Sequence, residues 1–451
     1  MATTREEMLE AGVRLYGARS TGLLRSLTAG ALAERAGFHR QTFYRHWETQ
    51  SEYVQDLVRW LLDPARGPAA DGAEVLPRRH DAPADLEAFV HDLARHDLDR
   101  VLSEETIRMR FGLLMTEVLR EPPFPEILHA YYESTMGRLA AAYDALLGTW
   151  GLQLLDGVTS RDVARMIQAQ LIGFAVLAKS VQVDPPSTLL FERSTVTLLR
   201  GLSRPRPADG PMAVPPEGDA TPGGAPSPPG AASAKADTRQ RFLEAGVRLY
   251  SELARDLLRG LTAGRVAKEA GLHRQTFYRC WKSHDAYIDE LLRWLLVPGR
   301  GPRAAGVEEL RRQRSVAPDL EAFVGDLARH DLANLLEDGY SRMRLGLALT
   351  GTIDGSMAPL SQAYYEDAIA RIAHTLGPLL DRWGLEAVDD ESLASSANVL
   401  EAQLIGSMIL VKAVPDDDPP VSDLLERALL TVLGSLTRPR SSVEAPGGPG
   451  A

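Results

Sequence analysis

The sequence predicts an all-α protein that contains the same helical unit twice. Apolar residues recur at steps of three and four, as in Leu86, Phe89, Val90 and Leu93, which is the period of an amphipathic helix. We find no run in which apolar and polar residues alternate as they do in a half-buried strand. Pro and Gly gather between the periodic stretches, where helices end.

The repeat is densest near the start of each copy. Residues 5–64 align with 239–298 at a constant offset of 234, and 34 of these 60 positions are identical. The segment His39–Arg45 recurs unchanged as His273–Arg279. The match continues at lower density over about 205 residues of each copy. Because this period is far longer than that of a solenoid, each copy is expected to be a unit of domain size.

The composition is that of a folded, soluble chain, with 44% apolar and 25% charged residues among 451. The single cysteine, Cys280, excludes an intramolecular disulfide and favours a reducing compartment. The first ten residues carry Arg5, Glu6 and Glu7 and lack the apolar core of a secretory signal. Apolar runs are shorter than the roughly 20 residues that span a bilayer. We therefore expect a cytoplasmic protein with no membrane partner.

The first fifty residues of each copy predict a helix-turn-helix. In copy one a first helix is expected over 5–17, and Thr28 is a suitable N-cap for a second helix over 29–36. Gly37 permits the tight turn that ends this helix, and a third helix is expected over 39–47. Two short helices joined by a glycine-containing turn are typical of DNA-binding proteins, in which the second of them enters the major groove.

The side chains of the third helix suit this role. Phe43 and Trp47 form an inward stripe, and the other side chains are polar or amphipathic donors. Arg can read guanine and Gln can read adenine, which makes Arg40 and Gln41 candidate base-reading residues. An ordinary amphipathic surface helix is the alternative interpretation, but the turn, the spacing and the presence of two copies favour DNA.

The charge is divided along the chain in a way that the net charge of −11 conceals. Residues 1–47 sum to +3 and residues 235–282 sum to +6, so the rest of the chain carries −20. Phosphate binding needs only a local basic face. Two basic amino-terminal parts on acidic bodies are therefore compatible with a nucleic-acid partner.

The run from Thr28 to Trp47 resembles the helix-turn-helix of TetR-family transcriptional regulators, and the run from Thr262 to Trp281 resembles it equally. The Ala-Gly turn, the Thr-Phe-Tyr core and the aromatic end follow the family's order over about 50 residues. The resemblance implies a three-helix DNA-binding domain followed by a larger helical domain, which binds an inducer and dimerises through its last two helices. The predicted fold is thus all-α with two tandem TetR-like units.

The resemblance also implies site residues by position. Arg40, Gln41, Arg274 and Gln275 would face bases. The remaining candidates would contact the DNA backbone or add charge beside it: Thr28, Thr42, Tyr44, Arg45, His46, Thr262, Thr276, Tyr278, Arg279 and Lys282. Cys280 stands where copy one has His46, and Lys282 is expected to offset that lost contact.

The sequence departs from the family at the start of the third helix of each copy. We call this helix the recognition helix, after its role in the family. His39 and His273 stand where a small Ser or Thr usually caps this helix, so a weaker cap is expected.

The expected organisation has six segments: helix-turn-helix domains at 1–48 and 237–282, larger helical effector and dimerisation domains at 49–206 and 283–440, a Pro/Gly-rich linker at 207–236, and a disordered tail at 441–451. Thirteen of the 28 residues at 207–234 are Pro or Gly. This composition predicts a flexible or polyproline-like linker that allows the two copies to pack side by side.

Polar side chains on the apolar helices of the larger domain are candidate ligand contacts: His96, Arg108 and Tyr131 in copy one, and His330, Arg342 and Tyr364 in copy two. Solvated faces, ion pairs or core positions are the alternative interpretation. No nucleophile elbow, phosphate loop or metal-ligand spacing is recognisable. We therefore expect no catalytic residue, no metal, no cofactor and no enzyme activity.

The last two helices of each copy are rich in Leu, Ile and Val; they are expected over about 160–182 and 187–203, and over about 394–413 and 421–437. An isolated pair of such helices leaves an apolar face that normally marks an interface. We expect copy one to pack on copy two within the chain as a single-chain pseudo-dimer. A homodimer of chains is the alternative.

Together these expectations predict a regulator that binds a near-palindromic double-stranded DNA operator and is released from it, as a repressor, by an unknown small-molecule effector. A TetR-fold module that binds a ligand or a protein and has lost DNA binding is the alternative. The intact Arg-Gln pairs in both copies favour the regulator.

Overall fold

A computed structural model of the chain describes residues 26–62, 86–93, 95, 98, 124–180, 187–207, 241–242, 245, 260–296, 312, 314–333, 358–388, 392–413 and 420–440. These residues are predominantly helical, which confirms the all-α prediction. The first helix expected over 5–17 lies outside the described residues, as do the tail and nearly all of the linker.

The two copies have the same order of elements. Copy one contains α2 (Ala29–Ala36), α3 (Arg40–Tyr44), α4 (Gln50–Leu62), α6 (Leu86–Leu93), α9 (Phe124–Thr149), β1 (Leu152–Leu154), α10 (Ser160–Ser180), α11 (Ser187–Gly201) and β2 (Ser203–Pro205). Copy two contains α13 (Ala263–Glu269), α14 (Arg274–Cys280), α15 (His284–Leu296), α17 (Leu320–Asp326), the π-helical turn η4 (Leu327–Asp331), α20 (Ala358–Trp383), β3 (Leu385–Ala387), α21 (Ser392–Ala413), α22 (Val421–Leu436) and β4 (Thr437–Pro439).

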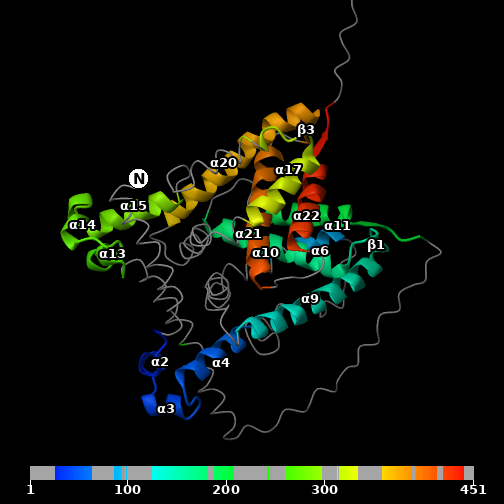
Figure 1. Ribbon diagram of the computed structural model, residues 1–451. Coiled ribbons are helices and arrows are strands. Elements are labelled where there is room, and N and C mark those ends of the chain that lie inside the picture. Colours follow the sequence, from blue (N-terminus) through cyan, green and yellow to red (C-terminus); the bar gives the residue numbers. More distant parts are fainter. Residues whose placement is uncertain are drawn as a thin grey trace, which may run out of the picture.

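The molecule has two small ends and one shared body. We call α2–α4 head one and α13–α15 head two. Figure 1 shows the heads apart from each other on one side of the body, in which α10, α11, α21 and α22 lie together. Helix α4 of head one packs on α9, and α15 of head two packs on α20. The long helices α9 and α20 therefore connect each head to the body.

Copy one and copy two pack against each other through α10 and α21, which meet at small residues. A Cβ atom on Gly173 would overlap the backbone carbonyl of Ala402, and a Cβ atom on Gly406 would overlap that of Ala169. These residues hold equivalent positions in the two copies, so the same contact is made from either helix. Only glycine allows another backbone to come this close.

Further contacts join the copies around this point. Arg427 on α22 donates a hydrogen bond from Nη1 to the carbonyl oxygen of Gly157 at 2.8 Å. One buried apolar cluster includes side chains from both copies, among them Phe174 and Phe191 from copy one and Ile409 and Val432 from copy two. The apolar faces that the sequence left unpartnered thus cover one another within the chain.

Two short antiparallel ribbons correct the expectation of a chain without strands. β1 pairs with β2, with Leu152 opposite Pro205, and β3 pairs with β4, with Leu385 opposite Pro439. Each ribbon follows a left-handed glycine, Gly151 or Gly384. Strands of three residues are too short to show the alternation by which a strand is recognised in a sequence.

One described segment, Leu393–Val411 on α21, is long and apolar enough to cross a membrane by length and composition. Of its most apolar window, 83% is buried inside the protein. Its apolar character is accounted for by its position at the centre of the body, where it packs on α10, α20 and α22.

Candidate functional site

Capping interactions define the helix-turn-helix of head one. The Thr28 hydroxyl accepts a hydrogen bond from the Ala31 amide at 3.4 Å, which confirms the predicted cap and the predicted helix over 29–36. Gly37 follows in the left-handed region with φ 74°. Helix α3 then begins after His39, whose Nδ1 accepts from the Gln41 amide at 3.4 Å. The imidazole therefore takes the place of the usual hydroxyl cap.

Head two repeats this geometry with small differences. Gly271 makes the left-handed turn with φ 69°, and His273 Nδ1 accepts from the Gln275 amide at 3.3 Å. The Thr262 side chain makes no cap hydrogen bond to α13. The recognition helices are shorter than expected over 39–47, because α3 ends at Tyr44 and α14 ends at Cys280. In copy one Arg45 follows as the C-cap, and His46 lies in the turn beyond it.

A buried aromatic group supports each recognition helix from behind. Phe43 and Trp47 pack with ring centroids 5.3 Å apart, and Trp47 Nε1 donates to Asp56 Oδ2 at 2.8 Å. Phe43 and Tyr53 are fully buried, which confirms the predicted inward stripe. Burial, with a smaller contribution from Asp56, raises the pKa of Tyr53 well above its ordinary value.

The equivalent residues of head two pack in the same way. The Phe277 and Trp281 rings lie 5.2 Å apart, and Trp281 Nε1 donates to Glu290 Oε2 at 2.8 Å. These hydrogen bonds run from the end of α3 to α4 in head one and from the end of α14 to α15 in head two, so they fix the orientation of the outward face.

The outward face of each recognition helix carries the predicted base-reading residues. Arg40, Gln41, Arg274 and Gln275 are exposed. Arg40 Nη2 donates to Tyr44 Oη at 3.1 Å, and Arg274 makes the same bond to Tyr278 at 3.3 Å, a hydrogen bond that raises the arginine's pKa. In both copies the guanidinium thus stands over an exposed tyrosine ring, held by an i, i+4 pair.

The other predicted DNA-binding residues lie on the same two heads. Thr28, Arg45, Thr262, Arg279 and Lys282 are exposed, and Thr42, His46 and Thr276 are half-buried. Each head therefore brings its predicted residues together on and beside one short helix, while the aromatic core lies behind them.

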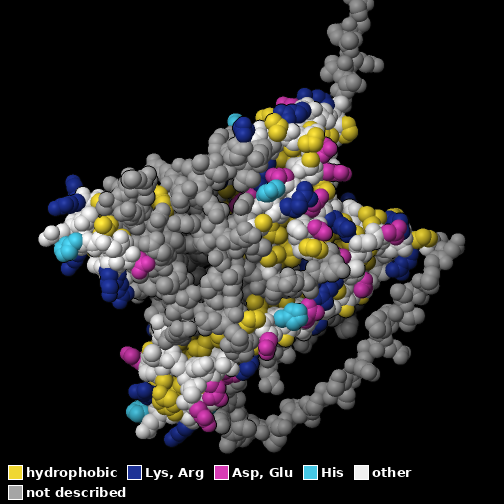
Figure 2. Space-filling model, in the orientation of Figure 1, with side chains coloured by type: hydrophobic (Ala, Val, Ile, Leu, Met, Phe, Trp, Pro, Cys, Tyr) yellow, Lys and Arg dark blue, Asp and Glu magenta, His cyan; other side chains and the backbone are white. Residues whose placement is uncertain are grey.

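The two heads differ in charge. Head two exposes Arg265, Lys268 and Lys282 where head one has Ala31, Glu34 and Glu48. Figure 2 shows Lys and Arg side chains gathered at the α13–α14 end, while acidic side chains stand among the basic ones at the α2–α3 end. Head two has the more positive surface.

A second candidate site is a cavity of about 210 Å³ in copy two. It lies between α17, η4, α20 and α21, and its polar lining side chains are Arg314, Asp331, Arg371, Thr375 and Glu401. Phe323, Leu327, Ala368, Ile372 and Leu404 make up the apolar part of the wall. Ligand pockets typically combine an apolar wall with a few fixed polar groups in this way.

Charged groups in this cavity are held by neighbours. Arg314 donates to both carboxylate oxygens of Asp331, at 2.6 and 3.0 Å, and to Asp326 at 3.0 Å. Burial raises the pKa of Glu401 to about 7, opposed by Arg371 and reinforced by Asp331. Copy one has Gln168 at the position of Glu401. The buried carboxyl group with the raised pKa is therefore specific to copy two.

The three predicted ligand-contact residues that the structure describes, Tyr131, His330 and Tyr364, are not in the described lining of this cavity. His330 is exposed, and its Nδ1 lies 2.8 Å from Asp326 Oδ1. Tyr131 and Tyr364 are half-buried beside the core, each packed edge-on against the next tyrosine, Tyr132 or Tyr365. His96, Arg108 and Arg342 lie outside the described residues.

Sequence reasoning did not single out Arg314 and Glu401, which line the cavity together with Asp331. Arg314, Asp331 and Glu401 come from three separate segments, and nothing in their local spacing links them. One signal was available: Glu401 is a carboxylate in an otherwise apolar stretch that copy one fills with an amide.

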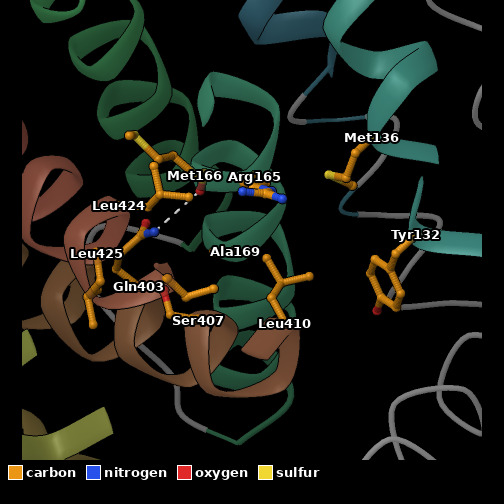
Figure 3. A pocket seen from close by; sticks show the side chains of 11 residues that line it. Tyr132, Met136, Arg165, Met166, Ala169, Gln403, Ser407, Leu410, Leu424 and Leu425 are labelled. Atoms are coloured by element: carbon orange, nitrogen blue, oxygen red, sulfur yellow. Dashed lines mark hydrogen bonds between the residues drawn. The ribbon is translucent and has the colours of Figure 1, made fainter. Parts of the chain in front are cut away.

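A smaller crevice lies where the two copies meet (Figure 3). Tyr132 and Met136 from α9 face Arg165 on α10, and Gln403 on α21 donates from Nε2 to the Met166 carbonyl at 3.4 Å. The crevice measures about 20 Å³, which is room for about one water molecule. It therefore belongs to the packing between the copies.

Among the described residues, no group of three His, Cys, Asp or Glu side chains is placed to hold a metal ion. No protein-family model matches the chain, and no curated protein matches it. A function for the heads and the cavity is therefore inferred from their geometry alone.

Proposed function

We propose that the protein is a TetR-like, sequence-specific DNA-binding regulator in which one chain supplies both recognition helices. The observation that carries the proposal is the repeated head: Arg40 and Gln41 in one copy, and Arg274 and Gln275 in the other, are exposed at the start of short helices with the same cap and the same aromatic support. Such pairs suit guanine and adenine in the major groove.

The body joins the heads within one chain. Because α10 and α21 belong to the same polypeptide and cover each other's apolar faces, a single chain has the two heads that a palindromic site requires. We infer that the operator has two nearly identical half-sites, since the seven residues from His39 and from His273 are the same.

The cavity in copy two supports release by a small molecule. It lies beside α20, the helix on which head two's α15 packs. A ligand that favours one position of α20 would change the position of head two and so the affinity for DNA. Repression is the simplest consequence of binding an operator, and activation remains the alternative outcome.

The test begins with selection of binding sites from random duplex DNA by the full chain. We expect an enriched inverted repeat, bound by one chain of about 49 kDa with an affinity that falls steeply with salt. The double variant Arg40→Ala/Arg274→Ala should lose at least about thirtyfold in affinity, because each of the two bidentate contacts contributes about 1–3 kcal/mol. Arg382→Ala, on the body, serves as the control.

Several outcomes would overturn the proposal. If the selection enriched no sequence, the protein would not be a sequence-specific DNA-binding regulator. The alternative of a ligand- or protein-binding module would then be preferred. Affinity that does not depend on salt would contradict phosphate contact. Light scattering at twice the single-chain mass would replace the single-chain pseudo-dimer with a pair of chains.

A further inference from the structure

Residues from the start of copy two lie in the core of head one. Phe242 is fully buried, and its ring stacks on Phe38 with centroids 5.2 Å apart. It also meets Phe43 and Trp47 edge-on, at 5.8 and 5.7 Å. Ala245, one helical turn further on, is fully buried in the same cluster. A large aromatic side chain of one copy thus completes the aromatic core of the other.

Polar contacts fix the position of this segment. Tyr53 Oη, on α4, donates to the carbonyl oxygen of Phe242 at 3.0 Å. Arg241 Nη2 donates to the carbonyl oxygen of Ala36 at 3.2 Å, and its guanidinium carbon lies 4.5 Å from the centroid of the Phe38 ring. Ala36 ends α2, and the last carbonyls of a helix lack intrahelical donors and attract a cation.

The corresponding residues of copy one suit this slot less well. Glu7 and Met8 stand at the repeat positions of Arg241 and Phe242. A carboxylate cannot donate to the Ala36 carbonyl, and its charge is unfavourable at the C-terminal end of a helix. Methionine also lacks the ring that stacks on Phe38.

The slot itself is also specific to head one. Head two has Leu272 in place of Phe38, so it has no ring at that position for the Arg241 guanidinium. The cation–π contact and the aromatic stack both require the phenylalanine of head one. Arg241 and Phe242 of copy two therefore fit the site around Phe38 in head one better than the equivalent site around Leu272 in their own copy.

We propose that Arg241, Phe242 and Ala245 are a permanent structural part of head one, although they belong to copy two, so that head one is complete only when these residues are docked in it. The interaction surface consists of Ala36, Phe38, Phe43, Trp47 and Tyr53, together with His46, whose ring centroid lies 6.2 Å from that of Phe242. The predicted base-reading side chains Arg40 and Gln41 are exposed and are not part of this surface.

The exchange ties the two heads together. Ala245 is held in head one, and the next described residue of copy two, Gly260, which lies just before α13 of head two, follows fifteen positions later. A fully extended chain of this length spans at most about 54 Å. The heads are thus restrained by a direct tether between them as well as by the body.

Cross-linking tests where the segment lies. In a Cys280→Ser background, Phe38→Cys/Arg241→Cys is compared with Leu272→Cys/Arg241→Cys, which places the partner cysteine at the equivalent site of head two. Both keep Phe242. With a short bismaleimide, we expect an intramolecular cross-link in the first pair and none in the second. The proposal would be overturned if the second pair alone were cross-linked, or if both pairs were cross-linked equally. It would also be overturned if neither pair were cross-linked, or if the cross-link joined two chains.

Hydrogen exchange of the full chain tests whether the docking supports head one. For Phe242→Ala, we expect exchange to be faster by roughly tenfold or more in residues 40–62 and unchanged in 263–296. Met8→Ala, the same change at the equivalent position of copy one, should leave 40–62 unchanged. Faster exchange confined to head two, or equal in both heads, after Phe242→Ala would overturn the proposal. A response of head one to Met8→Ala would do the same.

A charge change at Arg241 supplies a milder variant in case Phe242→Ala unfolds the chain. Arg241→Glu introduces the residue of copy one, and we expect severalfold faster exchange in head one with Arg241→Lys in between. Equal behaviour of the two variants would contradict the contact with Ala36. These readouts use no DNA, so they stand apart from the test of the proposed function.

Discussion

The carbonyl oxygen of Ala402 occupies the space in which a β-carbon on Gly173 would stand. Ala169 and Gly406 stand in the same relation from the other side. At the centre of the body α10 of copy one therefore crosses α21 of copy two at close range. The distance between the two helices is this short because each has a glycine at the crossing. Several measurable consequences follow from this crossing and from the heads it supports.

Replacing Gly173 or Gly406 by alanine should destabilise the fold by about 1–3 kcal/mol, because the added methyl group forces α10 and α21 apart. Urea unfolding of each variant measures this cost. Gly137→Ala on α9 is the control: its added Cβ would meet nothing within 4 Å, so it should be neutral or stabilising by up to about 1 kcal/mol. Equal effects at positions 173 and 137 would contradict the close crossing.

Glu401 should make stability depend on pH. Its pKa is about 7 in the fold, against an ordinary value of 4.5. Between these values the unfolded chain loses the proton while the folded chain retains it, so stability is full below about pH 4.5 and falls as the pH rises to about 7. Glu401→Gln should remove this loss.

The expected difference for Glu401→Gln is a stability gain of about 3 kcal/mol over the unmodified protein at pH 8, shrinking towards zero at pH 4.5. Urea unfolding at the two pH values measures it. A gain of the same size at both values would show that the amide acts through packing rather than through the proton.

The charge difference between the heads should appear in DNA binding. Lys282→Glu gives head two the residue of head one, and Glu48→Lys makes the reverse change. We expect the first to weaken operator binding by about tenfold and to reduce the salt slope by about one, and the second to strengthen binding by a similar factor. Fluorescence anisotropy at several salt concentrations measures both. Opposite signs at the two positions are required, and the same sign would contradict the prediction.

The imidazole caps should matter to the recognition helices. His39→Ala or His273→Ala removes the acceptor of the Gln41 or Gln275 amide and should cost about 0.5–1 kcal/mol of stability. Serine at either position should retain it, because its hydroxyl also accepts. Thermal unfolding of the four variants compares them. If the alanine and serine variants had the same unfolding temperature, the cap hydrogen bonds would make no contribution to stability.

Sequence reasoning located the features that depend on neighbouring residues. Thr28, Gly37 and the stripe of Phe43 and Trp47 follow from local rules of capping and periodicity, and the structure confirms them. The ribbons β1–β2 and β3–β4 were not predicted, because strands of three residues are too short to show an alternation of apolar and polar side chains.

Features that depend on distant segments could not be predicted in this way. Arg314 and Glu401 meet in one cavity although 86 positions separate them. The packing of Phe242 in head one could not be predicted either, because an alignment of repeats does not tell which copy a side chain packs into. Both cases require the path of the chain in three dimensions.

The crossing at Gly173 and Gly406 also bears on how such a chain can evolve. In a dimer of identical chains, one codon change alters both sides of the symmetry axis at once. Here the two sides have separate codons, so each can change alone while the other is kept. Arg165 on α10 and Asn398, at the equivalent repeat position on α21, already differ. Each half of such a chain can therefore change by single substitutions that in a symmetric dimer would alter both halves at once.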